Sequence, residues 1–193
     1  MTAETTTSAS GRRQFLLIAA VFAVPLMLAA WMYYFDSSLA PDSSTNKGEL
    51  LLPIVNLNDE LASSDIHNIL SNQWLMLYVN TSDCGSACDD ALVRLRQSRL
   101  MLGKDMGRIG RVFLHGDSAP DTVAIEQQHS GLITMTDKDL SLLLEEKRPA
   151  ELRSGGLYLI DPLGNLVMYF PPDLDPKEMV GDIKHLLKLS HIG

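Results

Sequence analysis

Several patterns that mark nucleic-acid-binding and nucleotide-dependent proteins are missing from this chain of 193 residues. It holds 16 Lys and Arg against 24 Asp and Glu, giving a formal net charge of −8, and such a charge disfavours contact with a phosphate backbone. The chain also lacks a glycine-rich phosphate loop, a zinc-ligand spacing and a Ser/His/Asp array. We therefore expect no nucleic-acid partner and find no support for a hydrolase or nucleotide-binding function.

Cysteine is also scarce, but the two cysteines, Cys84 and Cys88, lie four residues apart between an apolar run and a long helical pattern. We expect Cys88 in the first turn of that helix and Cys84 just ahead of it. Free backbone N–H groups and the positive end of the helix dipole stabilise a thiolate there. If the helix includes both positions, the i to i+4 spacing brings the sulfurs within reach of a disulfide or of one soft metal ion.

Two considerations qualify this thiol site. Asp83, Asp89 and Asp90 flank the cysteines, and nearby carboxylates oppose the thiolate form that the helix end favours. The alternative is that the two cysteines form a disulfide with only a structural role. Such a bond stabilises little, because a loop this short removes little entropy from the unfolded chain.

The amino-terminal segment predicts a membrane anchor. Residues 15–35 form a run of 21 residues without a charge, which is long enough to cross a hydrocarbon core of roughly 30 Å as a helix. Arg12 and Arg13 precede the run and Asp36 follows it, so the amino end is expected on the cytoplasmic side. The chain then divides into a cytoplasmic tail (1–14), a transmembrane helix (15–35), a linker (36–47) and a domain (48–193) in the bacterial periplasm, outside the inner membrane, where disulfides persist.

Two other export signals compete with a retained anchor. Residues 12–16, with the sequence Arg-Arg-Gln-Phe-Leu, are similar to a twin-arginine signal, and residues 38–40 could form a small-residue cleavage site. The apolar run is longer than a usual signal core, and Pro41 directly after the second site disfavours cleavage. We therefore expect a single-pass membrane protein.

Beyond the linker, the hydrophobic pattern predicts an α/β domain. Residues 50–57 suit only an edge strand, because Pro53 interrupts them. The long helix is expected to bury Ala91, Leu92, Leu95, Leu102 and Met106 and to end at Gly107, and a capping box at Thr136 and Asp139 is expected to open a later helix. Strands are predicted at 74–79, 112–114, 132–135, 157–160 and 166–170, and helices at 66–70 (one turn), 88–106, 121–129, 136–146 and 176–189. This order is that of a thioredoxin-like domain, a mixed central sheet with helices on both faces.

The chain resembles the Sco/SenC family in its single anchor, in the pair Cys84-x-x-x-Cys88 after Tyr78-Val79, and in residues 157–164 with the sequence Leu-Tyr-Leu-Ile-Asp-Pro-Leu-Gly. Members of that family are membrane-anchored thioredoxin-like proteins that assist cytochrome c oxidase assembly as copper chaperones or thiol reductases. The resemblance implies that Cys84 and Cys88 bind Cu(I). It also implies client protein thiols as partners, with the copper subunit of the oxidase among the candidates.

The sequence departs from that family at the metal site. Copper-binding members have a histidine shortly before the strand at 157–160, whereas residues 151–156 contain none, and Gly85 replaces the usual proline. His115, at the end of a predicted strand, is the candidate for a displaced third ligand. The remaining histidines are expected at the surface or at helix ends: His67, His129, His185 and His191. Four methionines are expected in the core rather than at copper: Met76, Met101, Met106 and Met168.

Two functional hypotheses result. In the first, a membrane-anchored periplasmic thiol–disulfide protein assists assembly of the copper centre of cytochrome c oxidase by thiol reduction, Cu(I) delivery or both, with Cys84 attacking and Cys88 resolving. In the second, a non-catalytic anchored assembly or interaction factor carries a structural disulfide.

Overall fold

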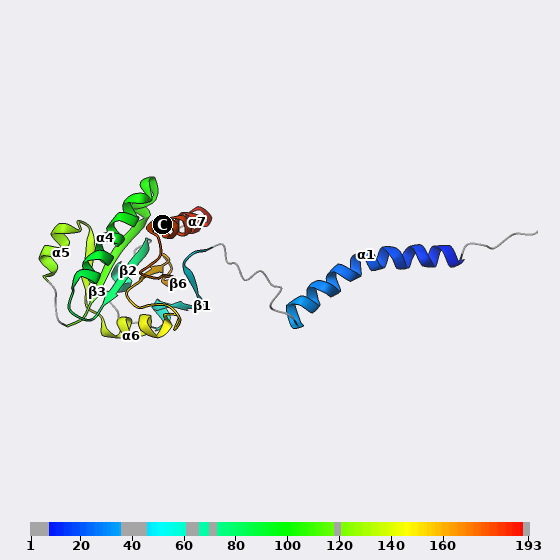
Figure 1. Cartoon of the computed structure of the whole chain (residues 1–193), viewed down its shortest axis with the longest axis horizontal. Coiled ribbons are helices and arrows are strands. Elements are labelled where there is room, and N and C mark those ends of the chain that lie inside the picture. Colours follow the sequence, from blue (N-terminus) through cyan, green and yellow to red (C-terminus); the bar gives the residue numbers. More distant parts are fainter. Residues whose placement is uncertain (1–7, 36–45, 61–65, 70–72, 118–120, 191–193) are drawn as a thin grey trace, which may run out of the picture. The chain divides into compact units, whose positions relative to one another are not determined.

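The computed structural model of the chain describes residues 8–35, 46–60, 66–69, 73–117 and 121–190. The chain forms two units, residues 1–45 and residues 46–193, which are described separately (Figure 1). Most of the predicted linker, the predicted cleavage site and His191 lie outside the described residues, and the side chain of His67 does too.

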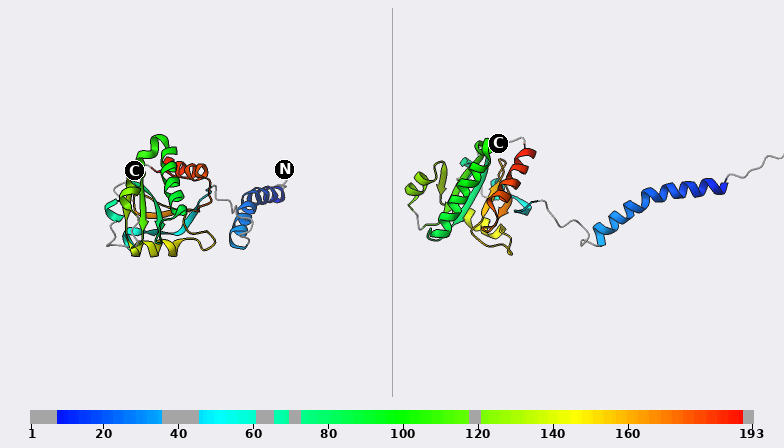
Figure 2. Two further views of the ribbon diagram at one scale, coloured as in Figure 1. Left: turned by 60° about the vertical axis from the view of Figure 1, so that its left-hand side comes forward. Right: turned by 45° about the horizontal axis from the view of Figure 1, so that its top comes forward.

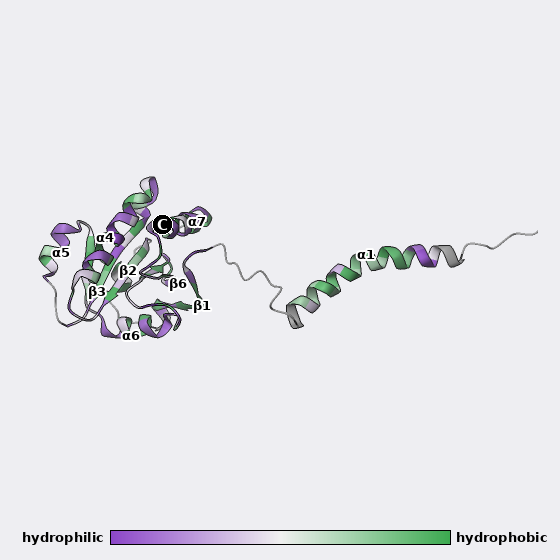
Figure 3. Ribbon diagram, viewed as in Figure 1, coloured by the Kyte–Doolittle hydropathy of each residue, from purple (hydrophilic) through white to green (hydrophobic). Residues whose placement is uncertain are grey.

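The first unit contains one long helix, α1 (Ser8–Phe35). Within it, the 22 residues Gly11–Met32 are long and apolar enough to cross a membrane, and apolar residues dominate most of its length (Figure 3). The helix begins seven residues ahead of the predicted span, at Ser8 rather than residue 15. The prediction of one apolar helix of membrane-spanning length is thus confirmed.

The second unit is built on a six-stranded mixed sheet with the strand order β1-β6-β5-β2-β3-β4. Strands β2, β3 and β4 run parallel, whereas β5 pairs antiparallel with β2 and with β6, and β1 pairs antiparallel with β6. The strands are β1 (Glu49–Asn56), β2 (Trp74–Asn80), β3 (Ile109–His115), β4 (Leu132–Met135), β5 (Leu157–Ile160) and β6 (Asn165–Phe170). The edge position predicted for the Pro53 strand is confirmed, because β1 lies at one end of this order.

Helices cover both faces of the sheet (Figure 2). Trp74, Met76 and Tyr78 of β2 pack with α4 and α7, and the alternate residues Leu75 and Leu77 pack on the other face, where α6 contributes to the core. This alternation follows from the two-residue period of a strand that is buried on both sides. The helices are α2 (Leu57–Glu60), α3 (Ile66–Ile69), α4 (Ser86–Met101), η2 (Gly103–Arg108, a 3-10 helix), α5 (Thr122–Gln128), α6 (Lys138–Lys147) and α7 (Pro176–Leu189).

Helix α4, which begins at the cysteine pair and which we call the thiol helix, ends earlier than predicted. Helix α4 stops at Met101, because Gly103 takes a left-handed conformation with φ +63° that favours glycine, and not at Gly107. The 3-10 turn that follows rotates Met106 out of the buried stripe, so that its side chain is 42% exposed. The four other residues predicted for that stripe are buried: Ala91, Leu92, Leu95 and Leu102.

Aspartates cap three later helices. Asp121 accepts a hydrogen bond from the backbone N of Ala124 at the start of α5, and Asp175 likewise begins α7 ahead of Pro176. The capping box predicted at Thr136 is wrong, because Asp137 caps α6 through the backbone N of Leu140. With these adjustments, the predicted fold class is confirmed: a mixed sheet with helices on both faces.

Candidate functional site

Cys84 and Cys88 form a disulfide at the amino-terminal end of α4, with their Cα atoms 5.1 Å apart. Cys84 precedes the helix cap, Gly85, and is partly exposed, whereas Cys88 lies in the first turn and is 1% exposed. The carbonyl of Gly85 accepts hydrogen bonds from the backbone N of Cys88 at 2.9 Å and of Asp89 at 3.1 Å. The predicted placement of the two cysteines is confirmed.

The loop that presents Cys84 is shaped by Asn80, the last residue of β2. Its Oδ1 accepts hydrogen bonds from the backbone N of Ser82 at 3.2 Å and from Oγ of Ser82 at 2.8 Å, which turns the chain out of the sheet. The backbone N of Gly116 donates to the carbonyl of Asn80, and a Cβ at Gly116 would lie 2.4 Å from the carbonyl oxygen of Thr81. The loops after β2 and β3 are therefore in close backbone contact.

The electrostatic setting of the sulfurs combines two opposing influences, as predicted. The amino end of α4 favours negative charge, and Gly85 offers no side chain that would cap it. Against this, Oδ1 of Asp89 lies 3.9 Å from Sγ of Cys84. In the reduced protein the helix end would favour the thiolate of Cys84, and the Asp89 carboxylate would oppose it.

Two hollows are lined in part by residues close to the cysteines in sequence, and both linings include Gly155. One, of 360 Å³, is lined by Tyr78 and the β2–α4 loop on one side and by Glu145 and Ser154 on the other. The second, of 220 Å³, is lined by Ala87, Asp90, Ala91, Arg94 and Pro172. Gly155 lines both, has φ +83°, and has open space where a Cβ would stand. We call residues 153–156 the glycine loop.

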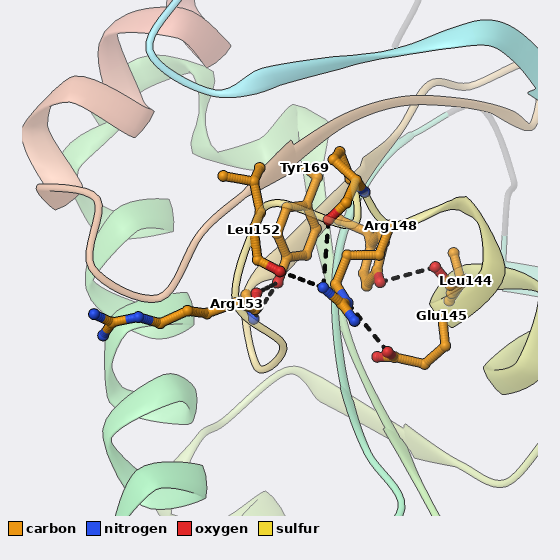
Figure 4. A network of polar contacts seen from close by, with 9 residues as sticks. Leu144, Glu145, Arg148, Leu152, Arg153 and Tyr169 are labelled. Atoms are coloured by element: carbon orange, nitrogen blue, oxygen red, sulfur yellow. Dashed lines mark hydrogen bonds and ion pairs between the residues drawn. The ribbon is translucent and has the colours of Figure 1, made fainter.

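Tyr169 holds the glycine loop against the sheet (Figure 4). Its hydroxyl donates to the carbonyl of Arg153 and accepts a hydrogen bond of 3.0 Å from the backbone N of Gly156. Burial raises the pKa of Tyr169, so its hydroxyl remains a donor at neutral pH. Gly156 fits there because a Cβ would lie 2.2 Å from the carbonyl oxygen of Phe170.

Arg148 fixes the chain leading into the glycine loop. Its guanidinium pairs with Glu145 at 3.2 Å and donates to the carbonyls of Pro149 and Leu152. The neighbouring Tyr158 donates to the carbonyl of Leu144 at 2.9 Å. No sequence pattern indicates this network, because its tyrosines alternate with aliphatic residues in ordinary strand patterns and no motif marks the hydroxyls.

Arg94 of α4 lines the smaller hollow and holds Pro172, another residue of its lining, in place. Its Nη1 donates to the carbonyls of Pro171 and Pro172, which ties the segment after β6 to the thiol helix. Partial burial lowers the pKa of Arg94, an effect that nearby Tyr169 and Asp173 counteract. No sequence motif marks this side chain.

His115 lies close to the thiol loop but makes no ready metal site with it. It is the ladder partner of Asn80, is 8% exposed, and its Nδ1 lies 2.9 Å from the carbonyl oxygen of Gly116. Within the described part of the chain, no group of three or more His, Cys, Asp or Glu is arranged to hold a metal ion. Two reduced sulfurs would still suit Cu(I), a soft ion.

The other candidate ligands are accounted for by packing and position. Met76 and Met168 are buried in the core as predicted, whereas Met101 and Met106 are 38% and 42% exposed, so their predicted core positions are wrong. His185 is exposed on α7. His129 lies at the end of α5, as predicted, but is 5% exposed, and burial together with Arg96 and Arg111 lowers its pKa.

A disulfide-bonded cysteine pair at the start of the helix that follows a central strand, within a mixed sheet covered on both faces, is the arrangement of a thioredoxin-like domain. The chain matches the family model described as "Transmembrane-like, thioredoxin-like, C-terminal domain" over residues 74–190. Residues 7–36 match the model "Transmembrane-like, N-terminal domain". The chain therefore belongs to this family of transmembrane-like, thioredoxin-like proteins.

Solved structures of Sco proteins are similar to this chain. Arabidopsis thaliana ScoI with copper bound is 19% identical, with a TM-score of 0.50, over 64% of this chain and 88% of that chain. Yeast Sco1 is 22% identical, with a TM-score of 0.50, over 64% and 84%. A SCO1/SenC family lipoprotein from Bacillus anthracis str. Ames is 14% identical, with a TM-score of 0.50, over 62% and 84%. Among curated proteins, none matches the chain. The resemblance noted in the sequence thus holds for the fold.

Proposed function

We propose that this protein is a membrane-anchored thiol–disulfide exchange protein whose Cys84–Cys88 pair cycles between disulfide and dithiol. The observation that carries the proposal is the unequal exposure of the two cysteines. Cys84 is partly exposed ahead of α4, and Cys88 is 1% exposed in its first turn. A client can therefore approach Cys84, while Cys88 is shielded and close enough to react with it.

The reaction proceeds in two steps when the pair is reduced. The Cys84 thiolate attacks one sulfur of a client disulfide, which forms a mixed disulfide and releases the first client thiolate. Cys88 then loses its proton and attacks Sγ of Cys84, which forms the Cys84–Cys88 disulfide and releases the second client thiolate. The client gains two electrons and the pair loses two, so a separate dithiol donor must reduce the protein for the next cycle.

The two hollows that share Gly155 are the proposed client site. One is lined by the β2–α4 loop and the other by the first turns of α4, and the glycine loop contributes to both. The open space beside Gly155 lets a client backbone approach closely. Tyr169 and Arg148 keep the glycine loop in place, so they act as positioning residues.

Cu(I) delivery is the second proposed activity. In the reduced protein, Cys84 and Cys88 would hold Cu(I) as cargo through two thiolates, and His115 is the candidate for a third ligand. The copper-bound Arabidopsis structure shares this fold. The absence of histidine from the glycine loop, together with the Nδ1 contact of His115 to Gly116, favours thiol reduction as the primary role.

The cellular setting is part of the same proposal. We place α1 in a bacterial inner membrane and the second unit in the periplasm, where the client thiols would include the copper subunit of cytochrome c oxidase. Support comes from the apolar helix and its transmembrane-like family match, from the residues Arg12 and Arg13 ahead of the helix, and from the resemblance to Sco proteins. The alternative is an anchored assembly factor whose disulfide is only structural.

Two measurements on the purified, pre-reduced full chain test these roles. With a small disulfide substrate, exchange predicts that about one substrate disulfide is reduced per chain as Cys84–Cys88 forms, and that Cys84→Ser abolishes this. In a Cu(I) titration in reducing buffer, we expect binding that a strong chelator reverses. If one equivalent of Cu(I) resisted the chelator and His115→Ala abolished that resistance, copper delivery would be the primary role. Absence of both activities would leave the structural alternative.

A further inference from the structure

Strand β1 exposes an apolar stripe at the edge of the sheet. Leu50, Leu52 and Ile54 alternate along the strand, and their side chains are 36%, 75% and 59% exposed. The pairing of β1 with β6 is irregular between Leu50 and Val55, and these exposed side chains lie in or at the edge of that irregular stretch. Edge strands are usually protected by charge, proline, bulges or covering elements. In β1, Pro53 and the irregular pairing oppose addition of another strand, but they leave the apolar side chains exposed.

The same strand borders a groove. A hollow of 260 Å³ lies between β1 and the end of α6, and its lining is mostly apolar. The lining residues are Glu49, Leu50, Leu51, Leu52, Pro53, Val55, Lys147 and Pro149. An apolar stripe beside an apolar groove suits aliphatic chains better than a polar partner.

The start of the domain lies a short length of chain after α1. Oδ2 of Asp182 in α7 accepts hydrogen bonds of 2.8 Å from the backbone N of Lys47 and of Gly48, which fixes the start of the domain. The stripe begins two residues later, at Leu50. Residues 36–46 link this point to the end of α1, and eleven residues span at most about 40 Å when fully extended. If α1 spans a bilayer, a chain of this length allows the stripe to reach the bilayer surface.

We propose that the β1 edge docks onto the lipid bilayer, with Leu52 and Ile54 inserted at its interface. The proposal rests on the membrane anchoring proposed above. Residues 36–193 carry a formal charge of −9, since the first 35 residues carry +1 of the total of −8. Attraction to anionic lipid is therefore not what holds the domain there, and apolar contact with zwitterionic lipid is sufficient.

Tryptophan quenching in brominated phosphatidylcholine bilayers tests this in the full chain. The reporter carries Trp31→Phe and Leu52→Trp, and an otherwise identical control carries Trp31→Phe and Val123→Trp. Val123 is 63% exposed on α5, which packs beside β4 at the opposite edge of the sheet. The remaining Trp74 is 5% exposed and common to both proteins. We expect bromination of the acyl chains to reduce the emission of the reporter and to leave that of the control unchanged.

The unsubstituted protein separates this inference from the anchoring on which it rests, because Trp31 lies within the apolar part of α1. If bromine quenches Trp31 but not the Leu52→Trp reporter, the anchor is inserted and docking of β1 is wrong. If Trp31 is not quenched, anchoring itself is wrong and docking falls with it. A blue shift of the reporter without quenching would show that a second copy covers the edge, which also overturns the proposal. An Ile54→Trp reporter is expected to repeat the Leu52→Trp result.

Discussion

Sγ of Cys84 lies 3.9 Å from Oδ1 of Asp89, so a carboxylate stands beside the more exposed sulfur of the pair. The same sulfur lies just ahead of the amino-terminal end of α4, where the helix dipole favours negative charge. The reactivity of the reduced protein therefore depends on which of these two influences is larger.

The first prediction removes the carboxylate. Asp89→Asn is expected to increase the rate at which a thiol-specific alkylating reagent modifies Cys84 near pH 7 by roughly three- to fivefold, because one unfavourable charge interaction at about 4 Å in water is lost. The measurement is the alkylation rate of the reduced Cys88→Ser protein with and without this substitution. Asp90→Asn is the matched control, since Asp90 is also exposed on α4 but lines the smaller hollow. An equal increase in both variants would contradict a specific effect of Asp89.

The second prediction separates a working thiol pair from a structural one. Reduction of Cys84–Cys88 should lower the free energy of unfolding by about 1–3 kcal/mol at most and leave the fold intact, because a loop this short removes little unfolded-state entropy. Urea unfolding of the oxidised and reduced protein, followed by circular dichroism, gives the value. The Cys84→Ser, Cys88→Ser double variant should match the reduced protein. Loss of the fold on reduction would support the structural alternative.

The third prediction concerns the glycine loop. Tyr169→Phe deletes the hydroxyl that joins Gly156 to Arg153, and should cost about 1–3 kcal/mol of stability while increasing amide exchange at Gly156. Tyr158→Phe is the control, because its hydroxyl bonds to Leu144 in α6 instead. It should lower stability by a similar amount without faster exchange at Gly156. Equal exchange at Gly156 in both variants would mean that Tyr169 does not position the loop.

Much of the fold follows from local sequence signals. The buried run of β2, the cysteines at the start of α4 and the caps Asp121 and Asp175 depend on neighbours within a few residues. Local signals also explain the errors. Gly103 and Gly107 are equally plausible as the end of the thiol helix, and only the left-handed conformation of Gly103 decides between them.

The surroundings of the disulfide were harder to predict. Tyr169 and Gly156 are thirteen residues apart in sequence and meet only through antiparallel pairing of β5 and β6. Arg94 reaches Pro172 across 78 residues. The sequence therefore predicts the position of the two candidate sulfurs, whereas the walls of the proposed client site depend on tertiary contacts that no motif encodes.

The fourth prediction follows from His129. Burial, with Arg96 and Arg111, lowers the pKa of this imidazole in the folded protein, so below about pH 6.5 the unfolded chain binds more protons than the folded one. Its contribution to stability is complete above that pH and is lost as the pH falls through the lower folded-state pKa. The free energy of unfolding, measured from pH 7 to pH 5, should decline less for His129→Gln than for the unsubstituted protein. An equal decline in His129→Gln and in the unsubstituted protein would contradict this prediction.

Trapping of a mixed disulfide tests the central claim most directly. The reduced Cys88→Ser protein, mixed with a disulfide-bonded client, is expected to accumulate a covalent adduct at Cys84, because the resolving sulfur is missing. The reduced Cys84→Ser protein should accumulate far less, since Cys88 is 1% exposed. Mass spectrometry of the peptide that carries each adduct identifies the attacking sulfur. Equal trapping at Cys88, or no adduct with either variant, would contradict exchange initiated by Cys84.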